Sequence, residues 1–458
     1  MGIAGSGMSA LARIMLARQL PVSGCEGRES ATVEALRELG AEISIGHSLD
    51  HLDRSDTVVY TTAIDPENFE LVAARERGLR VIRRASGLAA MITGSRSVAI
   101  AGTHGKTTTT SLLTVAAQAA GLNPSFAIGA NLHASGVNGH AGSGEVFIVE
   151  ADESDGSFLL LRPELAVVTN VEADHLENHG DLEGVFHAFE LFVDRIVPGG
   201  LLLSCADDAG ARRIADYARA RGVRVRSYGE SAGADIRVED IGEFEHSVAF
   251  TVHGLTDQPL RLSVNSLIGR HMALNATAAL ALLAELVPLT DPAPIAQAWQ
   301  GFSGVDRRFE FRGTAGGVRV YDDYAHHPTE VRVELAAARA VLDGGRLLAV
   351  FQPGTYSRTQ TFAAEFGQAL AVADLAVVMD IFPARERPIP GVTGALIAEL
   401  IPLPAERVVY EPDWQAVAGR VAALCEPGDL VLTMGIGDVH LLCPLILAAI
   451  EHERGSGR

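Results

Sequence analysis

Lysine is almost absent from this chain of 458 residues, although the chain carries 37 lysine and arginine side chains in all. One of them is Lys106, and the other 36 are arginine. Basic residues are also outnumbered by 57 acidic ones, which gives a formal net charge of −20. So acidic a protein is not expected to bind nucleic acid or an anionic membrane as its main partner. A phosphate ligand would have to be held by local devices, because no broad basic surface is available.

Cysteines and long apolar runs are scarce as well. The four cysteines are far apart and show neither a C-x-x-C motif nor zinc-ligand spacing, so we expect free, buried thiols: Cys25, Cys205, Cys425 and Cys443. The longest apolar stretch, residues 272–287, is interrupted by Asn275 and Glu285 and predicts a buried helix. The N-terminus lacks the apolar region of a signal peptide. We therefore expect a cytoplasmic protein without membrane insertion.

Three blocks of alternating strands and helices are indicated by the hydrophobic pattern. The length agrees with about three domains. The first block runs to about Thr93, the second opens with the apolar run 97–101, and the third begins after residues 307–309. Such alternation predicts α/β folding, with parallel sheets covered on both faces. Residues 234–262 alternate as antiparallel strands do.

A first glycine-rich turn lies at the very start of the chain. It matches G-x-G-x-x-A and leads into a predicted helix: Gly5, Ser6, Gly7, Met8, Ser9 and Ala10. Such a turn lets backbone N–H groups approach a pyrophosphate, and Glu26 lies where an acid commonly meets a ribose. A turn used for tight packing is the alternative. Only four residues precede it, so either the start is truncated or the sheet lacks a full central strand.

A second glycine turn carries the strongest prediction. The order is a strand at 97–101, a turn at 102–106 and a helix at 107–120, which is the order of a phosphate-binding loop. Its residues are Gly102, Thr103, His104, Gly105, Lys106, Thr107 and Thr108. The loop departs from G-x-x-x-x-G-K-[ST] because Ile100 replaces the first glycine. We expect Lys106 to reach the β- and γ-phosphates and the Thr107 hydroxyl to bind Mg²⁺.

Acidic residues and a histidine follow the next two predicted strands. Glu150 comes directly after the apolar strand 146–149, where α/β sheets gather ligands. Of the acids behind it, Glu153 is expected in a solvated loop. His175 follows the strand 165–169 beside Asp174 and is a candidate ligand for metal or phosphate.

Together these motifs resemble the Mur ligase family, the ATP-dependent amide-forming enzymes of peptidoglycan synthesis. The resemblance extends through nearly the whole chain, and further motifs carry it: residues 150–155, 169–175, 269–271, 307–309, 322–330, 351–353 and 435–438. The strings at 150–155 and 322–330 are typical of the alanine-adding members. The resemblance implies a Rossmann-like, UDP-sugar-binding N-terminal domain (1–94), a central P-loop ATPase domain with a parallel sheet (95–311) and a Rossmann-like C-terminal domain that closes over the site (312–458).

Individual roles follow from the same resemblance. Lys106 matches the phosphate-loop lysine, and Glu150 and His175 match the Mg²⁺ ligands. The remaining matches lie further along the chain: Asn275 near the adenine, Arg308 at the nucleotide, Asp323 as an acid that the third domain contributes to ATP, and His327 at the amino-acid end.

Three departures from the family pattern stand out. Relatives hold a second Mg²⁺ with a carbamylated lysine, but residues 176–194 contain no lysine, so Glu190 or water is the expected substitute. Met272 replaces a frequent asparagine, which puts one nucleotide contact in doubt. Gly354 and Thr355 replace a usual His-Arg pair.

The implied reaction joins L-alanine to the lactyl carboxylate of UDP-N-acetylmuramate. ATP would first convert that carboxylate into an acyl phosphate, with Mg²⁺ as cofactor, and His327 would act as the base for the incoming amine. The protein would be a monomer or a homodimer. The alternatives are a ligase that recycles a preformed peptide onto the same nucleotide sugar, a dinucleotide-binding oxidoreductase and a non-enzymatic, ATP-gated binding module.

Overall fold

The computed structural model describes residues 1–61, 64–384 and 386–455. The chain forms two compact units. Unit 1 comprises Met1–Glu239, Thr251–Arg261 and Leu274–Phe302, and unit 2 comprises Asp240–Phe250, Leu262–Ala273 and Ser303–Arg458. The domain bounds 1–94, 95–311 and 312–458 stay a prediction, and the last three residues of the third lie outside the described part.

The N-terminal part of unit 1 is built around an interrupted sheet. Its strands pair in parallel as two separate two-stranded pieces, β1–β2 and β3–β4. The gap is bridged by the first residues, since the nitrogen of Met1 donates to Val59 O and Gly2 N donates to Cys25 O. Among the described residues, the first four thus link the two pieces by hydrogen bonds without forming a strand. The elements are β1 (Ser23–Glu26), β2 (Glu42–Ile45), β3 (Thr57–Tyr60), β4 (Arg80–Arg83), α1 (Ser6–Ala17), α2 (Ala31–Glu38), the 3₁₀ helix η1 (Leu49–Leu52), α3 (Phe69–Glu76) and α4 (Arg84–Ile92).

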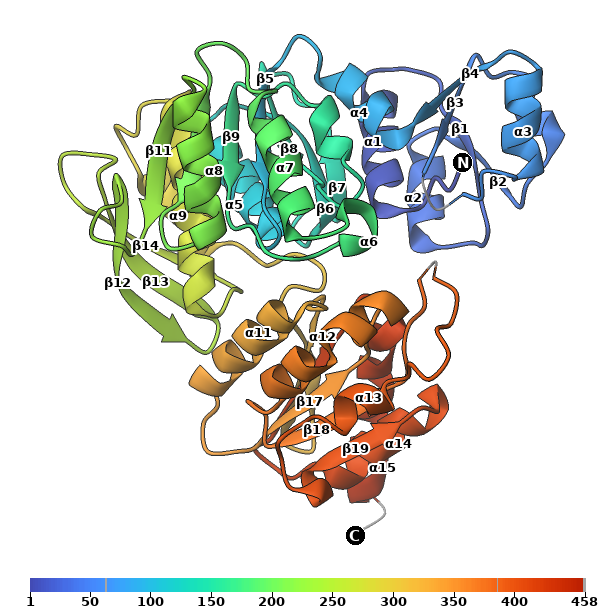
Figure 1. Ribbon diagram of the computed structural model, residues 1–458, viewed down its shortest axis with the longest axis vertical. Helices are drawn as coiled ribbons and strands as arrows, with labels where there is room; N and C mark the ends of the chain where they lie inside the picture. The colour runs from blue at the N-terminus through green and yellow to red at the C-terminus, as the bar shows by residue number, and fades with distance from the viewer. Residues whose placement is uncertain (62–63, 385, 456–458) are drawn as a thin grey trace. The chain divides into compact units, whose positions relative to one another are not determined.

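A ten-stranded sheet forms the centre of the described chain, in the order β14-β13-β12-β11-β10-β9-β5-β8-β6-β7. Strand β5 lies between β8 and β9 and is parallel to both, and β7 is antiparallel to β6. Figure 1 shows α7 and α8 in front of this sheet and α5 behind it. The strands are β5 (Arg96–Ala101), β6 (Ser125–Leu132), β7 (Val137–His140), β8 (Val146–Glu150), β9 (Leu165–Val168), β10 (Leu201–Cys205), β11 (Arg224–Gly229), β12 (Ile236–Phe244), β13 (Ser247–His253) and β14 (Leu260–Asn265).

The helices of this region cover buried strands whose residues are almost all apolar. In β5, Val98, Ala99, Ile100 and Ala101 are each 0% exposed, as expected of a central parallel strand. The buried helix predicted at 272–287 is present and ends one residue earlier, at Leu286, and no helix in the described ranges is long and apolar enough to span a bilayer. The helices are α5 (Lys106–Ala119), η2 (Ser157–Leu160), α6 (Leu176–His179), α7 (Leu182–Val193), α8 (Ala209–Ala220), α9 (Arg270–Leu286) and α10 (Ala293–Gln300).

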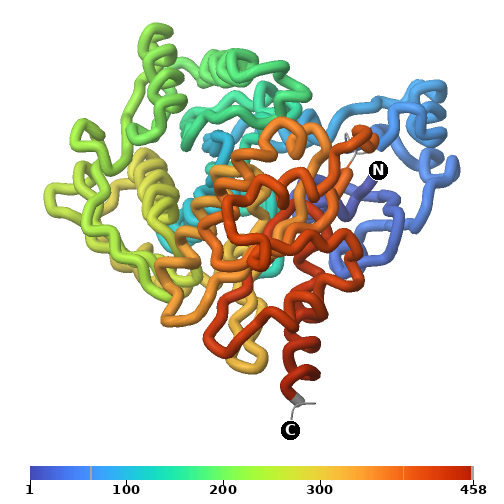
Figure 2. Tube along the Cα trace, turned by 60° about the horizontal axis from the view of Figure 1, so that its bottom comes forward, coloured from blue at the N-terminus to red at the C-terminus, as the bar shows by residue number. Residues whose placement is uncertain are grey.

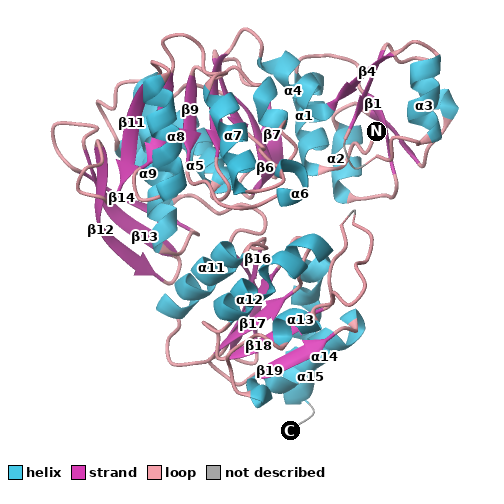
Figure 3. Ribbon diagram, viewed as in Figure 1, coloured by secondary structure: helices cyan, strands magenta, loops and turns pink. Residues whose placement is uncertain are grey.

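Unit 2 contains a six-stranded sheet in the order β15-β16-β20-β17-β18-β19, parallel except for the β15–β16 pair. Its strands alternate sides: Leu347, Ala349 and Phe351 face one core, and Leu348 and Val350 face another. The first core includes residues of α11, α12 and α13, and the second includes α14 and α15 (Figure 3).

Two buried cores on opposite faces make this part of the chain the predicted α/β layer structure. Figure 2 follows it from orange to red, up to the last helix. The elements are β15 (Glu310–Ala315), β16 (Val318–Asp323), β17 (Leu347–Phe351), β18 (Leu375–Met379), β19 (Val408–Glu411), β20 (Leu430–Met434), α11 (Pro328–Ala340), α12 (Tyr356–Leu370), α13 (Ala395–Ala398), η3 (Ala405–Arg407), α14 (Trp414–Leu424), η4 (Asp438–Leu441) and α15 (Leu442–Gly455).

Candidate active site

The loop between β5 and α5 can be formed only with glycine at two positions. Gly102 has a φ of +136°, and a Cβ there would lie 1.9 Å from the hydroxyl oxygen of Thr169. Gly105 has a φ of +81° and is the N-cap of α5, and a Cβ there would lie 2.6 Å from Oδ1 of Asn275. These values of φ are strained for any residue with a side chain. The two glycines thus let the backbone pass close to its neighbours before the helix begins.

The end of β9 anchors this loop. Thr103 N donates to the backbone oxygen of Asn170, His104 N donates to the Asn170 side chain at 2.8 Å, and the Thr169 hydroxyl donates to His104 O at 2.6 Å. Each of these bonds joins the segments that follow β5 and β9, two neighbouring strands of one sheet, at the carboxyl ends where α/β proteins bind ligands. The anchor fixes the loop before any ligand arrives, so the cost of ordering it on binding is small.

Lys106 is paired with Glu153, and this placement corrects the expectation of a solvated Glu153. The ammonium donates to Glu153 Oε1 at 2.8 Å, and also to Gly102 O and Thr103 O. Glu153 is only 3% exposed, and burial raises its pKa to about 7 against the opposing effect of Lys106. Burial lowers the pKa of Lys106, but Glu153 and further carboxylates raise it more, so its pKa lies above the usual range. The lysine is charged, held in place and balanced by a carboxylate of its own unit.

Thr107 and Glu150 meet at the start of α5. The Thr107 hydroxyl donates to Glu150 Oε1 at 3.1 Å, and Glu150 Oε2 accepts from Gly129 N at 2.8 Å. A hydroxyl and a carboxylate, both oxygen donors, form the set that Mg²⁺ prefers. The two predicted metal ligands therefore lie together beside Lys106. Thr108, the last residue predicted for the loop, is 3% exposed in the first turn of the helix.

His175 and Glu190 lie in different surroundings. His175 has a φ of +51° at the N-terminus of α6, with Nδ1 3.3 Å from Glu177 Oε1 and Nε2 3.6 Å from Asp174 Oδ2. Its role as a metal ligand stays a prediction. Glu190 lies on α7, 3.7 Å from His187, and its charge acts on Arg213 of α8. This places Glu190 against α8, and its described contacts do not favour it as a second Mg²⁺ ligand.

Asn275 lies at the phosphate loop itself. Its side-chain amide is close to Gly105, and the residue is 7% exposed in the second turn of α9. Met272, the departure from the family pattern, is one turn earlier and 3% exposed. The adenine contact predicted for Asn275 stays a prediction, and the structure adds a second use for the residue, which is to cover the N-terminus of α5.

The first glycine turn is constructed from different parts. Gly5 is the N-cap of α1, and a Cβ on Gly7 would lie 2.8 Å from Arg84 Nη1, so the guanidinium lies over the start of this helix. Glu26 accepts from Ala4 N at 2.8 Å, and Arg84 Nη2 is 3.9 Å from Asp152 Oδ2. A positive group at a helix N-terminus, where backbone N–H groups also point outward, forms an anion site.

Sequence reasoning missed Arg84, since its segment carries no motif. It also gave no role to the anchoring side chains of Thr169 and Asn170, although both lie in a segment that the family resemblance includes. The helix N-terminus at Ser6 could be read from the glycines, whereas the cation beside it could not, because it comes from a helix more than seventy residues later.

In unit 2, Asp323 organises the segment that carries Arg308. Asp323 is 2% exposed, and its two carboxylate oxygens accept from Phe309 N and Ala325 N, each at 2.7 Å. Burial, with the charge of Glu334, raises the pKa of Asp323 well above its usual range, while Arg308 opposes this effect. The guanidinium of Arg308 lies 5.2 Å from the centre of the Tyr324 ring. Asp323 thus positions Arg308, and its direct contact with ATP stays a prediction.

His327 is the N-cap of α11. Its Nδ1 accepts a hydrogen bond from Thr329 N at 3.3 Å. The backbone N–H of His327 donates in turn to the Glu330 carboxylate, which completes a capping box. In this arrangement the neutral ring carries its proton on Nε2. The residue is 5% exposed, and its ring packs edge-on against the ring of Phe362, with 5.4 Å between the two ring centres.

Near the departure at 354–355, the Thr355 hydroxyl donates to Glu386 Oε1 at 2.7 Å. Arg358 donates to Gly354 O at 3.0 Å and is 8% exposed. This segment is therefore held by contacts within unit 2.

Three family descriptions match consecutive parts of the chain, and they define its class. They are the Mur ligase family catalytic domain over residues 1–96, the Mur ligase middle domain over 100–283 and the Mur ligase glutamate ligase domain over 307–437. The chain belongs to the Mur ligase family.

Two curated relatives of the chain share one name. UDP-N-acetylmuramate--L-alanine ligase of Saccharopolyspora erythraea is 54% identical over 99% of this chain and 93% of the relative. The ligase of the same name from Acidothermus cellulolyticus is 51% identical over 99% and 94%. Among solved structures, UDP-N-acetylmuramate-alanine ligase of Thermotoga maritima has a TM-score of 0.79 at 26% identity and covers 99% of this chain and 98% of that chain. The predicted α/β fold and family are confirmed.

Proposed function

We propose that this chain joins L-alanine to UDP-N-acetylmuramate at the expense of ATP, as a step in the synthesis of peptidoglycan precursors in the cytoplasm. The observation that carries the proposal is the full-length identity of 54% to a ligase of that name, combined with a lysine-bearing phosphate loop beside Thr107 and Glu150. The bound nucleotide would be ATP at the second glycine turn and the UDP group at the first.

The chemistry requires an activated carboxylate, because a carboxylate is a poor acyl donor at neutral pH. We propose that the lactyl carboxylate attacks the γ-phosphate of ATP and forms an acyl phosphate with release of ADP. The amine of alanine then adds to the acyl carbon, and phosphate leaves. Lys106 would offset the repulsion between carboxylate and phosphates, since a preorganised charge costs no reorganisation at the moment of reaction. Arg308 would do the same at the nucleotide.

Mg²⁺ is the proposed metal, and the residues present fit it. The Thr107 hydroxyl and Glu150 would hold it, with His175 as a third ligand in the family's pattern. When bound, Mg²⁺ neutralises charge on the phosphate oxygens and stabilises the leaving group.

For the base, we propose His327 and a specific condition on it. While Nδ1 accepts the capping hydrogen bond, the proton of the neutral ring is on Nε2. Nε2 can therefore take up a proton only in the other tautomer, in which Nδ1 carries the proton and the cap is lost. His327→Asn tests the role because asparagine is a good N-cap but not a base. We expect a small loss of thermal stability, because the ring contact with Phe362 is lost while the cap is kept, and a fall in kcat of about a hundredfold. Full activity at every pH would show that His327 acts only as a cap.

The decisive experiment measures phosphate release from ATP with UDP-N-acetylmuramate against a panel of alanine, serine, glycine and a preformed tripeptide. Release with alanine and formation of the amide product support the proposal. A preference for the tripeptide would identify a recycling ligase, and nucleotide binding without substrate-dependent release would identify a binding module. Binding of a nicotinamide cofactor would favour an oxidoreductase. The same samples give the oligomeric state, proposed to be a monomer or a homodimer.

A further inference from the structure

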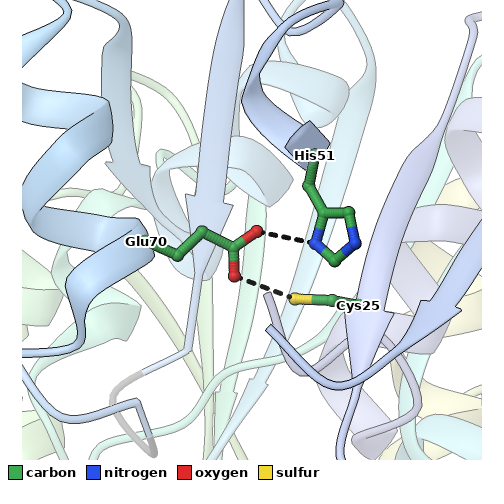
Figure 4. A group of neighbouring side chains, drawn as sticks. All are labelled: Cys25, His51 and Glu70. Atoms are coloured by element: carbon green, nitrogen blue, oxygen red, sulfur yellow. Dashed lines mark hydrogen bonds and ion pairs between the residues drawn. The ribbon is translucent and has the colours of Figure 1, made fainter. Parts of the chain in front are cut away.

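A cluster of metal-binding side chains lies in the N-terminal part of unit 1, outside the phosphate loop. Cys25 lies in β1, His51 belongs to η1, and Glu70 lies in the first turn of α3 (Figure 4). One potential ligand atom from each of the three lies within 4.8 Å of the other two. None of these residues takes part in the proposed ligation.

A fourth side chain completes the group. His47 Nδ1 is 3.5 Å from Cys25 Sγ and 2.6 Å from Glu70 Oε2. His51 Nδ1 is 2.9 Å from Glu70 Oε1, and Cys25 Sγ is 3.5 Å from Glu70 Oε2. The two histidines are separated by three residues, the spacing found in many zinc sites. The two histidines thus contact different oxygens of the Glu70 carboxylate, and the Cys25 sulfur lies beside the same carboxylate.

We propose that Cys25, His47, His51 and Glu70 form a closed structural site for Zn²⁺ or a cation of similar softness. Four protein ligands of the sulfur, nitrogen and oxygen types define a tetrahedral zinc site with no open position for a substrate. The cation would tie β1, the segment 47–51 and α3 together. This proposal is independent of the reaction that the phosphate loop supports.

The separations fit such a site. With Zn–N and Zn–O of about 2.0–2.1 Å and Zn–S of about 2.3 Å, a tetrahedral arrangement places its ligand atoms roughly 3.3–3.7 Å apart. The two separations from the sulfur, both 3.5 Å, already have this value. The distances from Glu70 to the two histidine nitrogens, 2.6 and 2.9 Å, involve different carboxylate oxygens, so a change of rotamer has to bring one histidine toward the oxygen that the other contacts.

Charge and burial also favour a cation. Cys25 and Glu70 are each 2% exposed. When the metal binds, the thiol of Cys25 releases its proton to solvent, and the thiolate and the Glu70 carboxylate then face both the divalent ion and the N-terminal ammonium of Met1, whose charge also acts on them.

An entry path exists on the histidine side. The side chains of His47 and His51 are 31% and 22% exposed, so an ion and its water can reach the buried sulfur and carboxylate between them. This separates the group from Thr107 and Glu150, whose ligands are all oxygens and suit Mg²⁺.

Cobalt(II) reports the ligands directly. Titrated into the untagged, reduced, metal-free full chain, Co²⁺ should bind with about one equivalent that gives an intense thiolate-to-cobalt absorption band and the visible bands of tetrahedral coordination. Cys25→Ser should abolish the thiolate band. Cys205→Ser is the matched control, because Cys205 is also a buried thiol with a pKa raised to about 11 but lies on β10 outside the cluster.

A second measurement keeps the proposal testable if Cys25→Ser does not fold. Zn²⁺ should raise the thermal midpoint of the wild type and of Cys205→Ser by several degrees, and it should do so far less in His51→Ala. The proposal is overturned if the wild type shows no thiolate band, if Cys25→Ser keeps it, or if His51→Ala gains as much stability as the wild type. Cobalt at Thr107 and Glu150 would give only the weak bands of oxygen ligands, so the two sites are distinguishable.

Discussion

The two glycine turns of unit 1 look alike in sequence and differ in structure. Both lead into a helix, α1 after Gly5 and α5 after Gly105. The second follows a fully buried strand in the middle of a ten-stranded sheet, and its cation comes from the helix itself. The first has no strand before it, and its cation, Arg84, comes from α4.

This difference shows how the cation at each turn is held in position. At the second turn, hydrogen bonds to Thr169 and Asn170 hold the loop, and the compact ammonium of Lys106 is bound to the loop's own carbonyl groups. At the first turn, Arg84 has a side-chain exposure of 23% and can adjust to its ligand. We expect the second turn to be intolerant of small changes and the first to be more forgiving.

The largest effect is expected at Lys106. In Lys106→Arg the charge is kept, but the wider, planar guanidinium does not fit the space defined by Gly102 O, Thr103 O and Glu153. Turnover should fall by about a thousandfold or more, as measured by phosphate release. The control is Arg96→Lys at the opposite end of β5, where a half-exposed pair with Glu164 should be replaceable with less than about a twofold change. Near wild-type turnover in Lys106→Arg would refute the role of the lysine.

Gly102→Ala should be the next most damaging change, since it combines a forbidden φ with a Cβ 1.9 Å from Thr169 Oγ1. We expect a loss of about 3 kcal/mol in the free energy of unfolding and roughly a hundredfold weaker nucleotide binding. Gly121→Ala, at the other end of α5, has a φ of +78° but open space around it. It should lose only about 1 kcal/mol and bind nucleotide normally. Equal losses in both variants would mean that backbone strain alone, rather than the close approach, constrains the loop.

The residues that sequence could and could not predict follow the same division. Strand β5 was predicted at residues 97–101, one residue short of its observed start at Arg96, because a parallel strand buried on both faces is a continuous apolar run. The phosphate loop was predicted because its parts are consecutive. The prediction of a solvated Glu153 was wrong because the burial of this residue depends on Lys106, which lies 47 residues away in the sequence. The acidic residues around Glu153 give no indication of that partner.

The cluster around Glu70 was not foreseen either. Cysteine spacing gave no zinc pattern, since the fold brings together one cysteine, two histidines and one glutamate from three different elements. Contacts of this kind are set by tertiary packing, which local sequence patterns do not record.

Arg84→Gln addresses the first turn and should have a moderate effect. Removing the charge at the start of α1 should raise KM for UDP-N-acetylmuramate about tenfold and leave KM for ATP unchanged. Arg83→Gln, an exposed neighbour in the chain, is the control and should change neither. An equal rise in both Michaelis constants would show that Arg84 acts through Asp152 and the phosphate loop, and the two turns would then be less independent than we propose.

The smallest effect concerns the pH dependence of nucleotide binding at the second turn. Since the pKa of Glu153 is about 7, its carboxylate is roughly half ionised at neutral pH, and the ionised form competes with the phosphates for Lys106. Binding of ATP should therefore take up a proton at Glu153, and the affinity should weaken as the pH rises through about 7. Between about pH 6 and about pH 8 we expect a three- to tenfold increase in Kd that Glu153→Gln removes. Calorimetry in buffers of different ionisation enthalpy measures the proton uptake. Protonation of ATP itself contributes equally in the wild type and in Glu153→Gln, so the difference between them reports Glu153. Asp155→Asn, an exposed acid in the same loop, should keep the wild-type profile. A pH dependence that survives in Glu153→Gln would assign the titrating group elsewhere and leave Lys106 paired in both states.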